Sequence, residues 1–99
     1  MARESNVVYI GQKPPMAYVL AVLTSFSDTN TPEVLLKARG RSITTAVDVA
    51  EITRRRFIKE LTVSNISIST EELEQREGGT RAVSCIEITL TNPAVAAKD

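Results

Sequence analysis

The sequence predicts one two-layer α+β domain whose elements follow one another in the order β-α-β-α-β-β. Its 99 residues suit a single domain, and a hydrophobic fraction of 42% is enough for a buried core. Two β-branched runs are each followed by an apolar pattern of helical spacing, and two alternating segments come last. We therefore expect a four-stranded mixed sheet with two helices on one face and a long protruding C-terminal hairpin.

The first half of the chain contains a strand, a helix and a second strand. Residues 7–10 are β-branched and aromatic and end at Gly11, which indicates a buried strand. A proline pair then suits the first turn of a helix, and apolar residues recur at three and four positions over residues 16–26. Residues 34–38 form a second strand, too continuously apolar to have an exposed face, and the loop 39–41 comes after it.

A second helix comes next, and Ser42 or Thr44 is expected to cap it. Glu51 stands four residues before Arg55, the favourable order for an ion pair, and the arginine run 54–56 falls in the last turn, where the helix dipole favours cations. One apolar stripe is expected to contain Ile43, Val47, Ala50 and Phe57.

The C-terminal part of the chain has the pattern of a hairpin. Apolar residues alternate over 61–68, but the alternation slips at Ser64-Asn65, which predicts a β-bulge. Gly78-Gly79 suits the hairpin tip, and the return strand covers residues 82–90. The domain is expected to span residues 1–99, with flexible ends at 1–5 and 92–99.

Several classes of protein are excluded by composition. The longest apolar run, residues 16–23, is far shorter than the roughly 20 residues of a membrane helix, and the first residues do not resemble a secretion signal. A single cysteine closes no intrachain disulfide. We expect a cytoplasmic protein without a membrane partner.

The residues also argue against an enzyme. Histidine is absent, which removes the usual general base and the commonest metal ligand. Cys85 falls inside a predicted strand and is best explained as a small buried hydrophobe. The acids Glu71 and Glu72 lie on an exposed hairpin, where nothing desolvates them. We expect no catalytic residue, metal or cofactor.

Charge is unevenly distributed, although the formal net charge is zero. Up to Lys59 there are nine Lys/Arg and five Asp/Glu, and from Glu60 onward there are three and seven. This asymmetry is typical of one basic working surface, but solvated faces produce it as well.

Two short basic loops come after the first two strands. Lys13 lies in the first loop, and Arg39 and Arg41 lie in the second. Parallel strands that feed helices on one face bring such loops to the same end of the sheet, so we expect the three cations to converge beside helix N-termini whose N–H groups suit a phosphate. Gly40 lets both guanidinium groups approach a polyanion. Composition alone supports a phosphate site and ordinary surface charges about equally, and the glycine between the two arginines favours the phosphate site slightly.

Five blocks of sequence resemble the Alba family of archaeal chromatin and RNA-binding proteins. They are residues 5–14, 18–21, 37–43, 46–48 and 56–57. The resemblance covers residues 5 to about 90 and implies a fold similar to the C-terminal domain of a translation initiation factor. It also implies a chromosome-associated homodimer that binds double-stranded DNA and RNA without sequence preference and condenses DNA.

The resemblance also assigns individual residues. The implied nucleic-acid contacts are Gln12, Lys13, Lys37, Arg39, Arg41, Arg76 and Arg81. The two arginines of the hairpin arm are implied to reach along the minor groove. Phe57 matches an aromatic residue used between neighbouring dimers, but helix periodicity equally allows it to be a core-facing anchor of the second helix.

Two features depart from the family pattern. Gln12 stands where many members have a lysine that is reversibly acetylated, so a weaker contact is expected there, without that switch. It also suggests a heterodimer with a lysine-bearing paralogue. In addition, the hairpin arm carries acids that would repel phosphate, and these are Glu71, Glu72, Glu74 and Glu77.

Dimerisation is also expected on physical grounds. The domain is too small to cover both faces of its sheet, and a two-fold partner would bury the isoleucines left exposed. These are Ile66, Ile68, Ile86 and Ile88. A different class of function remains open, because compact α+β dimers also serve as protein-interaction or small-ligand modules. Zero net charge favours that alternative.

Overall fold

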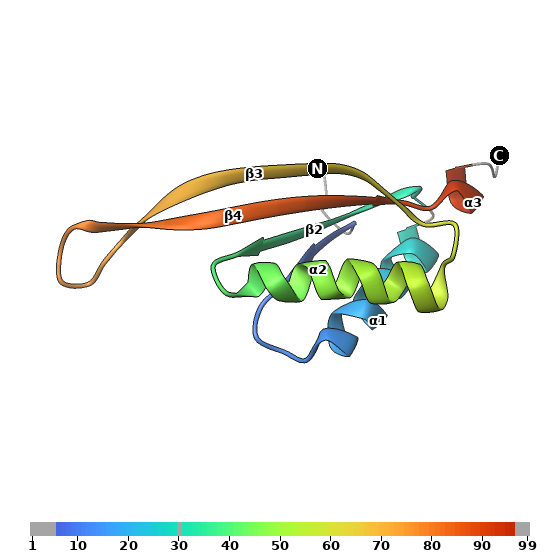
Figure 1. The fold of residues 1–99 in the computed structure, drawn as a ribbon, viewed down its shortest axis with the longest axis horizontal. Helices are drawn as coiled ribbons and strands as arrows, with labels where there is room; N and C mark the ends of the chain where they lie inside the picture. The colour runs from blue at the N-terminus through green and yellow to red at the C-terminus, as the bar shows by residue number, and fades with distance from the viewer. Residues whose placement is uncertain (1–5, 30, 97–99) are drawn as a thin grey trace.

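The computed structural model describes residues 6–29 and 31–96. In chain order the elements are β1 (Val7–Tyr9), α1 (Pro15–Thr29), β2 (Glu33–Arg39), α2 (Ser42–Ile52), the π-helical turn η1 (Thr53–Phe57), β3 (Thr62–Glu74), β4 (Thr80–Thr91) and α3 (Pro93–Ala96). The strands form one mixed sheet in the order β1-β2-β4-β3, in which β1 and β2 are parallel and the other pairs are antiparallel. This architecture confirms the predicted α+β class, and Figure 1 shows α1 and α2 on one side of the sheet with the hairpin extending past the body.

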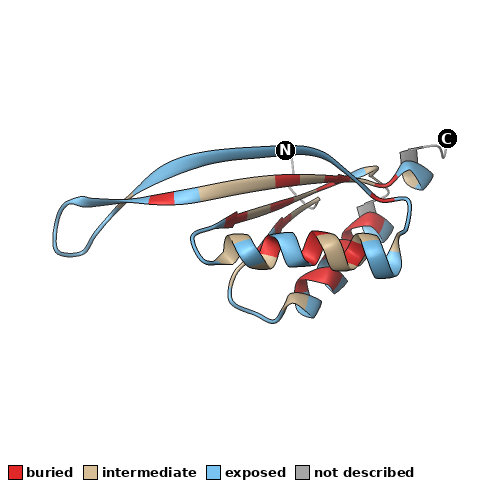
Figure 2. Ribbon diagram, viewed as in Figure 1, coloured by how far each residue is buried: buried red, intermediate tan, exposed pale blue. Residues whose placement is uncertain are grey.

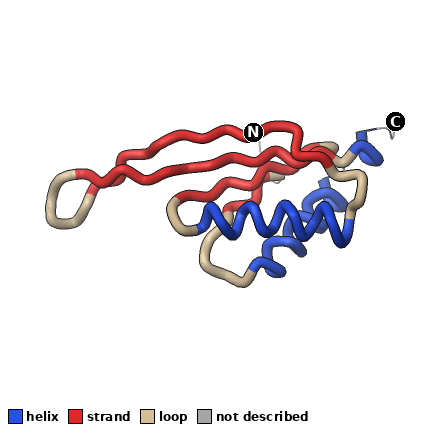
Figure 3. The backbone as a smooth tube through the Cα atoms, in the orientation of Figure 1, coloured by secondary structure: helices blue, strands red, loops and turns tan. Residues whose placement is uncertain are grey.

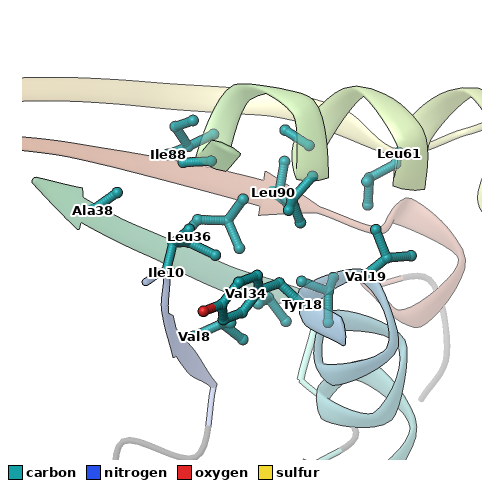
Figure 4. Close-up of a cluster of buried hydrophobic side chains, with 14 of the residues drawn as sticks. Val8, Ile10, Tyr18, Val19, Val34, Leu36, Ala38, Leu61, Ile88 and Leu90 are labelled. Atoms are coloured by element: carbon teal, nitrogen blue, oxygen red, sulfur yellow. The ribbon is translucent and has the colours of Figure 1, made fainter. Parts of the chain in front are cut away.

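The core lies between the sheet and the two long helices. In β2 the burial alternates, so that Val34, Leu36 and Ala38 face the helices while Leu35 and Lys37 are only half-buried (Figure 2). The core residues are Val8, Ile10, Tyr18, Val19, Val22, Phe26, Val34, Leu36, Ala38, Ala46, Val49, Ala50, Leu61, Ile88 and Leu90 (Figure 4).

Neither α1 nor α2 packs on the other face of the sheet, which we call the open face. The expectation that the first two strands are buried on both sides is therefore wrong. On the open face Tyr9 is 63% exposed. Both connecting helices pack on one face, as predicted, so the continuous apolar runs of these strands do not imply cover on both faces.

The predicted apolar stripe and cap of the second helix need correction. The buried residues are Ala46, Val49, Ala50 and Thr53, whereas Val47 is 44% exposed. Neither Ser42 nor Thr44 caps the helix, because its N-cap residue is Arg41, which makes no side-chain capping bond.

The π-helical turn explains where Phe57 lies. The N–H of Ile58 donates to the carbonyl of Thr53 over 2.9 Å, five residues back. This turn is wider than a regular helical turn, and it ends the helix, because Ile58 has an extended backbone. Phe57 is 46% exposed, so its interpretation as a core-facing anchor is wrong.

The hairpin confirms the predicted bulge and tip. Its register shifts between Val63 and Asn65, and Gly78 and Gly79 have φ angles of +94° and +79°. Of the four isoleucines expected to need a dimer partner, Ile88 is buried and Ile86 packs against the core, because α2 covers β4. The other two, on the edge strand β3, are exposed.

The C-terminal segment differs from the expected flexible end. Asn92 is buried, and its Oδ1 accepts a hydrogen bond of 3.1 Å from the N–H of Ala94. This contact starts the short helix α3, so the chain keeps regular structure up to residue 96. The expected flexible residues 1–5 and 97–99 lie outside the described part of the chain.

Candidate functional site

Two turns meet at one end of the sheet because β1 and β2 run parallel. The first turn, residues 10–14, leads from β1 to α1, and the second, residues 39–41, leads from the end of β2 to α2. The Ser42 hydroxyl joins them by donating to the carbonyl of Gly11 over 3.3 Å. Figure 3 shows both turns as loops at the end of the sheet toward which the hairpin extends.

Tyr18 fixes the first turn from the core side. Its hydroxyl oxygen accepts hydrogen bonds from the N–H groups of Gly11 and Lys13, at 2.9 and 3.0 Å, and the residue is 8% exposed. The ring lies on the buried face of α1, so the hydroxyl reaches the turn from inside. These two amides are therefore occupied, and the first turn offers fewer free donors than expected. The predicted apolar spacing of α1 is wrong in part, because Met16 and Leu20 are 42% and 58% exposed.

Gly40 shapes the second turn. Its φ of +60° is a left-handed conformation that favours glycine, and its N–H donates to the carbonyl of Ser84 over 2.9 Å. The turn is thereby held against β4, with an arginine on each side of the glycine. No side chain caps α2 at Arg41, and the N–H of Ile43 in the first turn of the helix donates to the carbonyl of Gly40 over 3.1 Å.

A hollow at this end of the sheet gathers several of the predicted residues. We call it the loop-end hollow. It brings together Gln12, Arg39, Arg41 and Arg81 from the two turns and the hairpin. Val83 and Leu73 of the hairpin also line it. Three arginines from separate parts of the sequence thus line one depression.

The two predicted lysines lie beside this hollow rather than in it. Lys13 is exposed and lines a neighbouring hollow between β1 and α1. Lys37 lies on the open face, where its Nζ is 3.6 Å from a carboxylate oxygen of Glu87 and 6.0 Å from the centre of the Tyr9 ring. The expected convergence of three loop cations therefore holds for the two arginines, and Lys13 contributes to the adjoining surface.

Arg39 has an acidic partner on the hairpin. Its Nη1 donates to Oε1 of Glu71 over 2.8 Å, and the two side chains are 57% and 53% exposed. Arg39 pairs in register with Cys85 of β4, and Cys85 pairs with Ser69 of β3. Glu71 lies two positions after Ser69 and therefore on the same face of the sheet, the open face. One of the arm's acids thus contacts a residue of the candidate site.

Arg76 and Phe57 are not part of this cluster. Arg76 is exposed in the loop that joins β3 to β4, at the far end of the hairpin. Phe57 ends η1, which continues α2 away from the two turns (Figure 1).

A second basic segment lies at the end of α2 and in η1. Arg54 makes hydrogen bonds of 2.8 to 3.2 Å to both carboxylate oxygens of Glu51, and Arg55 lies 3.3 Å from the same group. The hydrogen bonds from Arg54, together with the charges of Arg54 and Arg55, lower the pKa of Glu51 below its ordinary value. The predicted pair of Glu51 with Arg55 is present, but the pair with Arg54 is closer.

Sequence reasoning missed the residues that position and neutralise the site. The sequence analysis assigns Tyr18 no role of its own and expects Ser42 or Thr44 only as a helix cap, and the packed structure alone shows the contacts of Tyr18 and Ser42 with the first turn. The alternation along β3 and β4 indicates which hairpin residues share a face. It does not indicate which of them lies opposite Arg39, because that depends on the pairing of β2 with β4.

Metal-ligating clusters and membrane spans are both absent from the described residues. No group of three or more His, Cys, Asp or Glu side chains in residues 6–29 and 31–96 is arranged to hold a metal ion. Within the same ranges, every helix is too short or too polar to cross a bilayer.

Comparison with known proteins gives consistent matches. The chain is 49% identical over 88 residues to "DNA/RNA-binding protein Alba" of Picrophilus torridus, covering 89% of this chain and 97% of that protein. It is 56% identical over 85 residues to "DNA/RNA-binding protein Alba 1" of Archaeoglobus fulgidus, covering 86% and 93%.

Solved structures give the same result. "Alba from Thermoplasma volcanium" superimposes with a TM-score of 0.79 at 47% identity, covering 86% of this chain and 98% of that chain. The family model described as Alba matches residues 6–70. The chain belongs to the Alba family.

Proposed function

We propose that this protein binds double-stranded DNA and RNA without sequence preference, as a dimer associated with the chromosome, and that it helps to organise and condense DNA. The observation that carries the proposal is the loop-end hollow, in which Arg39, Arg41 and Arg81 meet from three parts of the chain. The relatives named as DNA/RNA-binding proteins support the same function. We expect no catalysis.

The proposed mechanism is electrostatic. A guanidinium group presents several N–H donors in a plane that matches phosphate oxygens, and the N-terminus of α2, which no side chain caps, adds favourable dipole charge beside Arg41. Lys13 and Lys37 extend this surface to either side. Contacts of this kind bind the backbone and carry no sequence information.

We propose that two copies associate through the exposed apolar surface of α2 and β3. Ile68 is 77% exposed and lines a shallow hollow together with Ile43 and Ile86. Val47 lies one helical turn after Ile43, and Ile66, 57% exposed, lies two residues before Ile68 on the same side of β3. An isologous partner would cover this surface together with the free edge of β3.

Titration of a labelled random duplex and a structured RNA at several salt concentrations tests the function. Two copies of Lys13, Arg39 and Arg41 neutralise up to about six phosphates, so the slope of log K against log salt should be near −5. Competition between the duplex and the RNA shows which of the two the protein binds more tightly. Absence of salt-sensitive binding to either would contradict the proposal and favour a protein-interaction or small-ligand module.

The paired variant Arg39→Ala/Arg41→Ala should weaken binding to all duplexes by a similar factor. Removing two phosphate contacts per protomer should also make the salt slope shallower by roughly 3 to 4 in a dimer. A matched control is Arg55→Ala/Arg56→Ala, which removes the same charge at the other end of α2. A loss confined to one duplex sequence would show base readout instead.

Gln12 bears on the choice of partner chain. It lines the loop-end hollow but carries no charge, so a partner with lysine at this position would add one phosphate contact per heterodimer. We propose such heterodimers with a lysine-bearing paralogue. Native mass spectrometry of the mixed proteins tests this, and homodimers alone in the spectrum would contradict it.

A further inference from the structure

The carboxylate of Glu71 occupies a position on Arg39 that a phosphate oxygen would take. It lies 2.8 Å from Nη1, a distance typical of a charge-assisted hydrogen bond. Both side chains are more than half exposed, so solvent screens the pair and a stronger anion can replace the carboxylate. Arg39 is thus already bound to an anion supplied by the protein itself.

Arg39 lies at the border of two hollows. It lines the loop-end hollow with Arg41 and Arg81, and it also lines a hollow on the open face. Of these two hollows, Glu71 lines only the one on the open face, and Arg41 and Arg81 line only the loop-end one. The Glu71 contact therefore holds the Arg39 guanidinium against a carboxylate of the open-face hollow.

We propose that Glu71 is an internal competitor of the nucleic-acid phosphate for Arg39. Binding exchanges one anion for the other: the phosphate takes Arg39 into the cluster with Arg41 and Arg81, and the Glu71 carboxylate is released to water. Glu71 thereby sets the affinity of the site. This inference rests on the proposed function and adds a residue that weakens the binding of nucleic acid.

The same arm supplies a matched control. Glu72 is exposed on the neighbouring position of β3 and points to the opposite face of the sheet, because successive strand residues alternate. Glu71→Gln and Glu72→Gln therefore remove the same charge from the same segment, and only the first removes the partner of Arg39. Comparing them separates competition from the general effect of a less acidic arm.

Fluorescence anisotropy with a random duplex is measured for both variants, each alone and combined with Arg39→Ala. We expect Glu71→Gln to bind about two- to fivefold more tightly than Glu72→Gln, the range set by the free energy of an exposed ion pair. With Arg39→Ala in place, the two variants should bind equally. Circular dichroism melts establish that all four variants are folded.

Three results would overturn the inference. Equal gains in affinity from the two variants would show that Glu71 acts only through general charge repulsion. Weaker binding by Glu71→Gln would show that the carboxylate orients Arg39 for the phosphate. A difference that persists with Arg39→Ala would place the competition elsewhere. Wild-type protein that binds no duplex or RNA at any salt concentration would overturn the proposed function and this inference with it.

Discussion

At the scale of single residues, the candidate site depends on a side chain that lies beneath its surface. The hydroxyl of Tyr18 is the acceptor for two N–H groups of the first turn. Those amides are partly buried beneath a turn that carries Gln12 and Lys13. The buried hydroxyl of Tyr18 thus helps to fix the backbone position of the exposed Lys13.

Tyr18→Phe tests this arrangement. It leaves the ring in place and removes the acceptor, so two partly buried N–H groups lose their partner, which should lower the free energy of unfolding by about 1 to 3 kcal/mol. Urea denaturation followed by circular dichroism measures the change. An unaltered midpoint would mean that water replaces the phenol without cost.

Arg39 shows what the residue scale leaves undetermined. Its type and its loop position are evident from the sequence, and so is the run of acids on the hairpin. That Glu71 meets it, while its neighbour Glu72 does not, depends on the pairing of β2 with β4 and of β4 with β3.

At the scale of elements, the end of α2 differs most from expectation. Helical periodicity assigns Phe57 and Ala50 to the same face, but the helix ends in a wider π-helical turn whose last residue, Phe57, is exposed. A regular helix was the reasonable prediction, because no glycine or proline in residues 42–57 marks the change.

The same helix end contributes a pH-dependent stability. The hydrogen bonds from Arg54 lower the pKa of Glu51 in the folded protein below its ordinary value of 4.5. A carboxyl whose folded-state pKa is lowered stabilises the fold above its ordinary value, and this contribution disappears as the pH falls through the folded-state pKa.

The variant Glu51→Gln should therefore melt below the wild type at pH 7 and approach it in acid. Thermal melts at a series of pH values from about 7 to about 3 measure the gap between the two proteins. A gap that stays constant below about pH 4 would show that the side chain acts through packing or neutral hydrogen bonds instead of charge.

At the scale of the whole molecule, the hairpin gives the protein its elongated shape. The principal extents of the described chain are 52 × 32 × 20 Å. Strand β4 pairs with β2 only between Thr91 and Cys85, so the rest of the hairpin extends past the body (Figure 1). An edge strand of thirteen residues, with exposed isoleucines, favours assembly with a second copy.

Ile68→Asp tests the proposed dimer surface. A carboxylate buried at the interface without a partner should raise the dimer dissociation constant by about a hundredfold or more. Sedimentation velocity over a range of concentrations measures it. Ser67→Asp is the control, because it adds the same charge on the opposite face of β3; a wild-type monomer at micromolar concentration would rule out the dimer.

The sequence by itself determined the order of the elements, the bulge, the hairpin tip and the residue types at the end of the sheet. These features obey local rules: hydrophobic periodicity, the conformations open to glycine, and the parallel direction of strands joined by a helix. The tertiary structure decided which face each strand exposes, the exposure of Phe57 and the partners of Arg39 and Lys37. Those features depend on how segments far apart in the chain pack and pair, and no local pattern records the register between them.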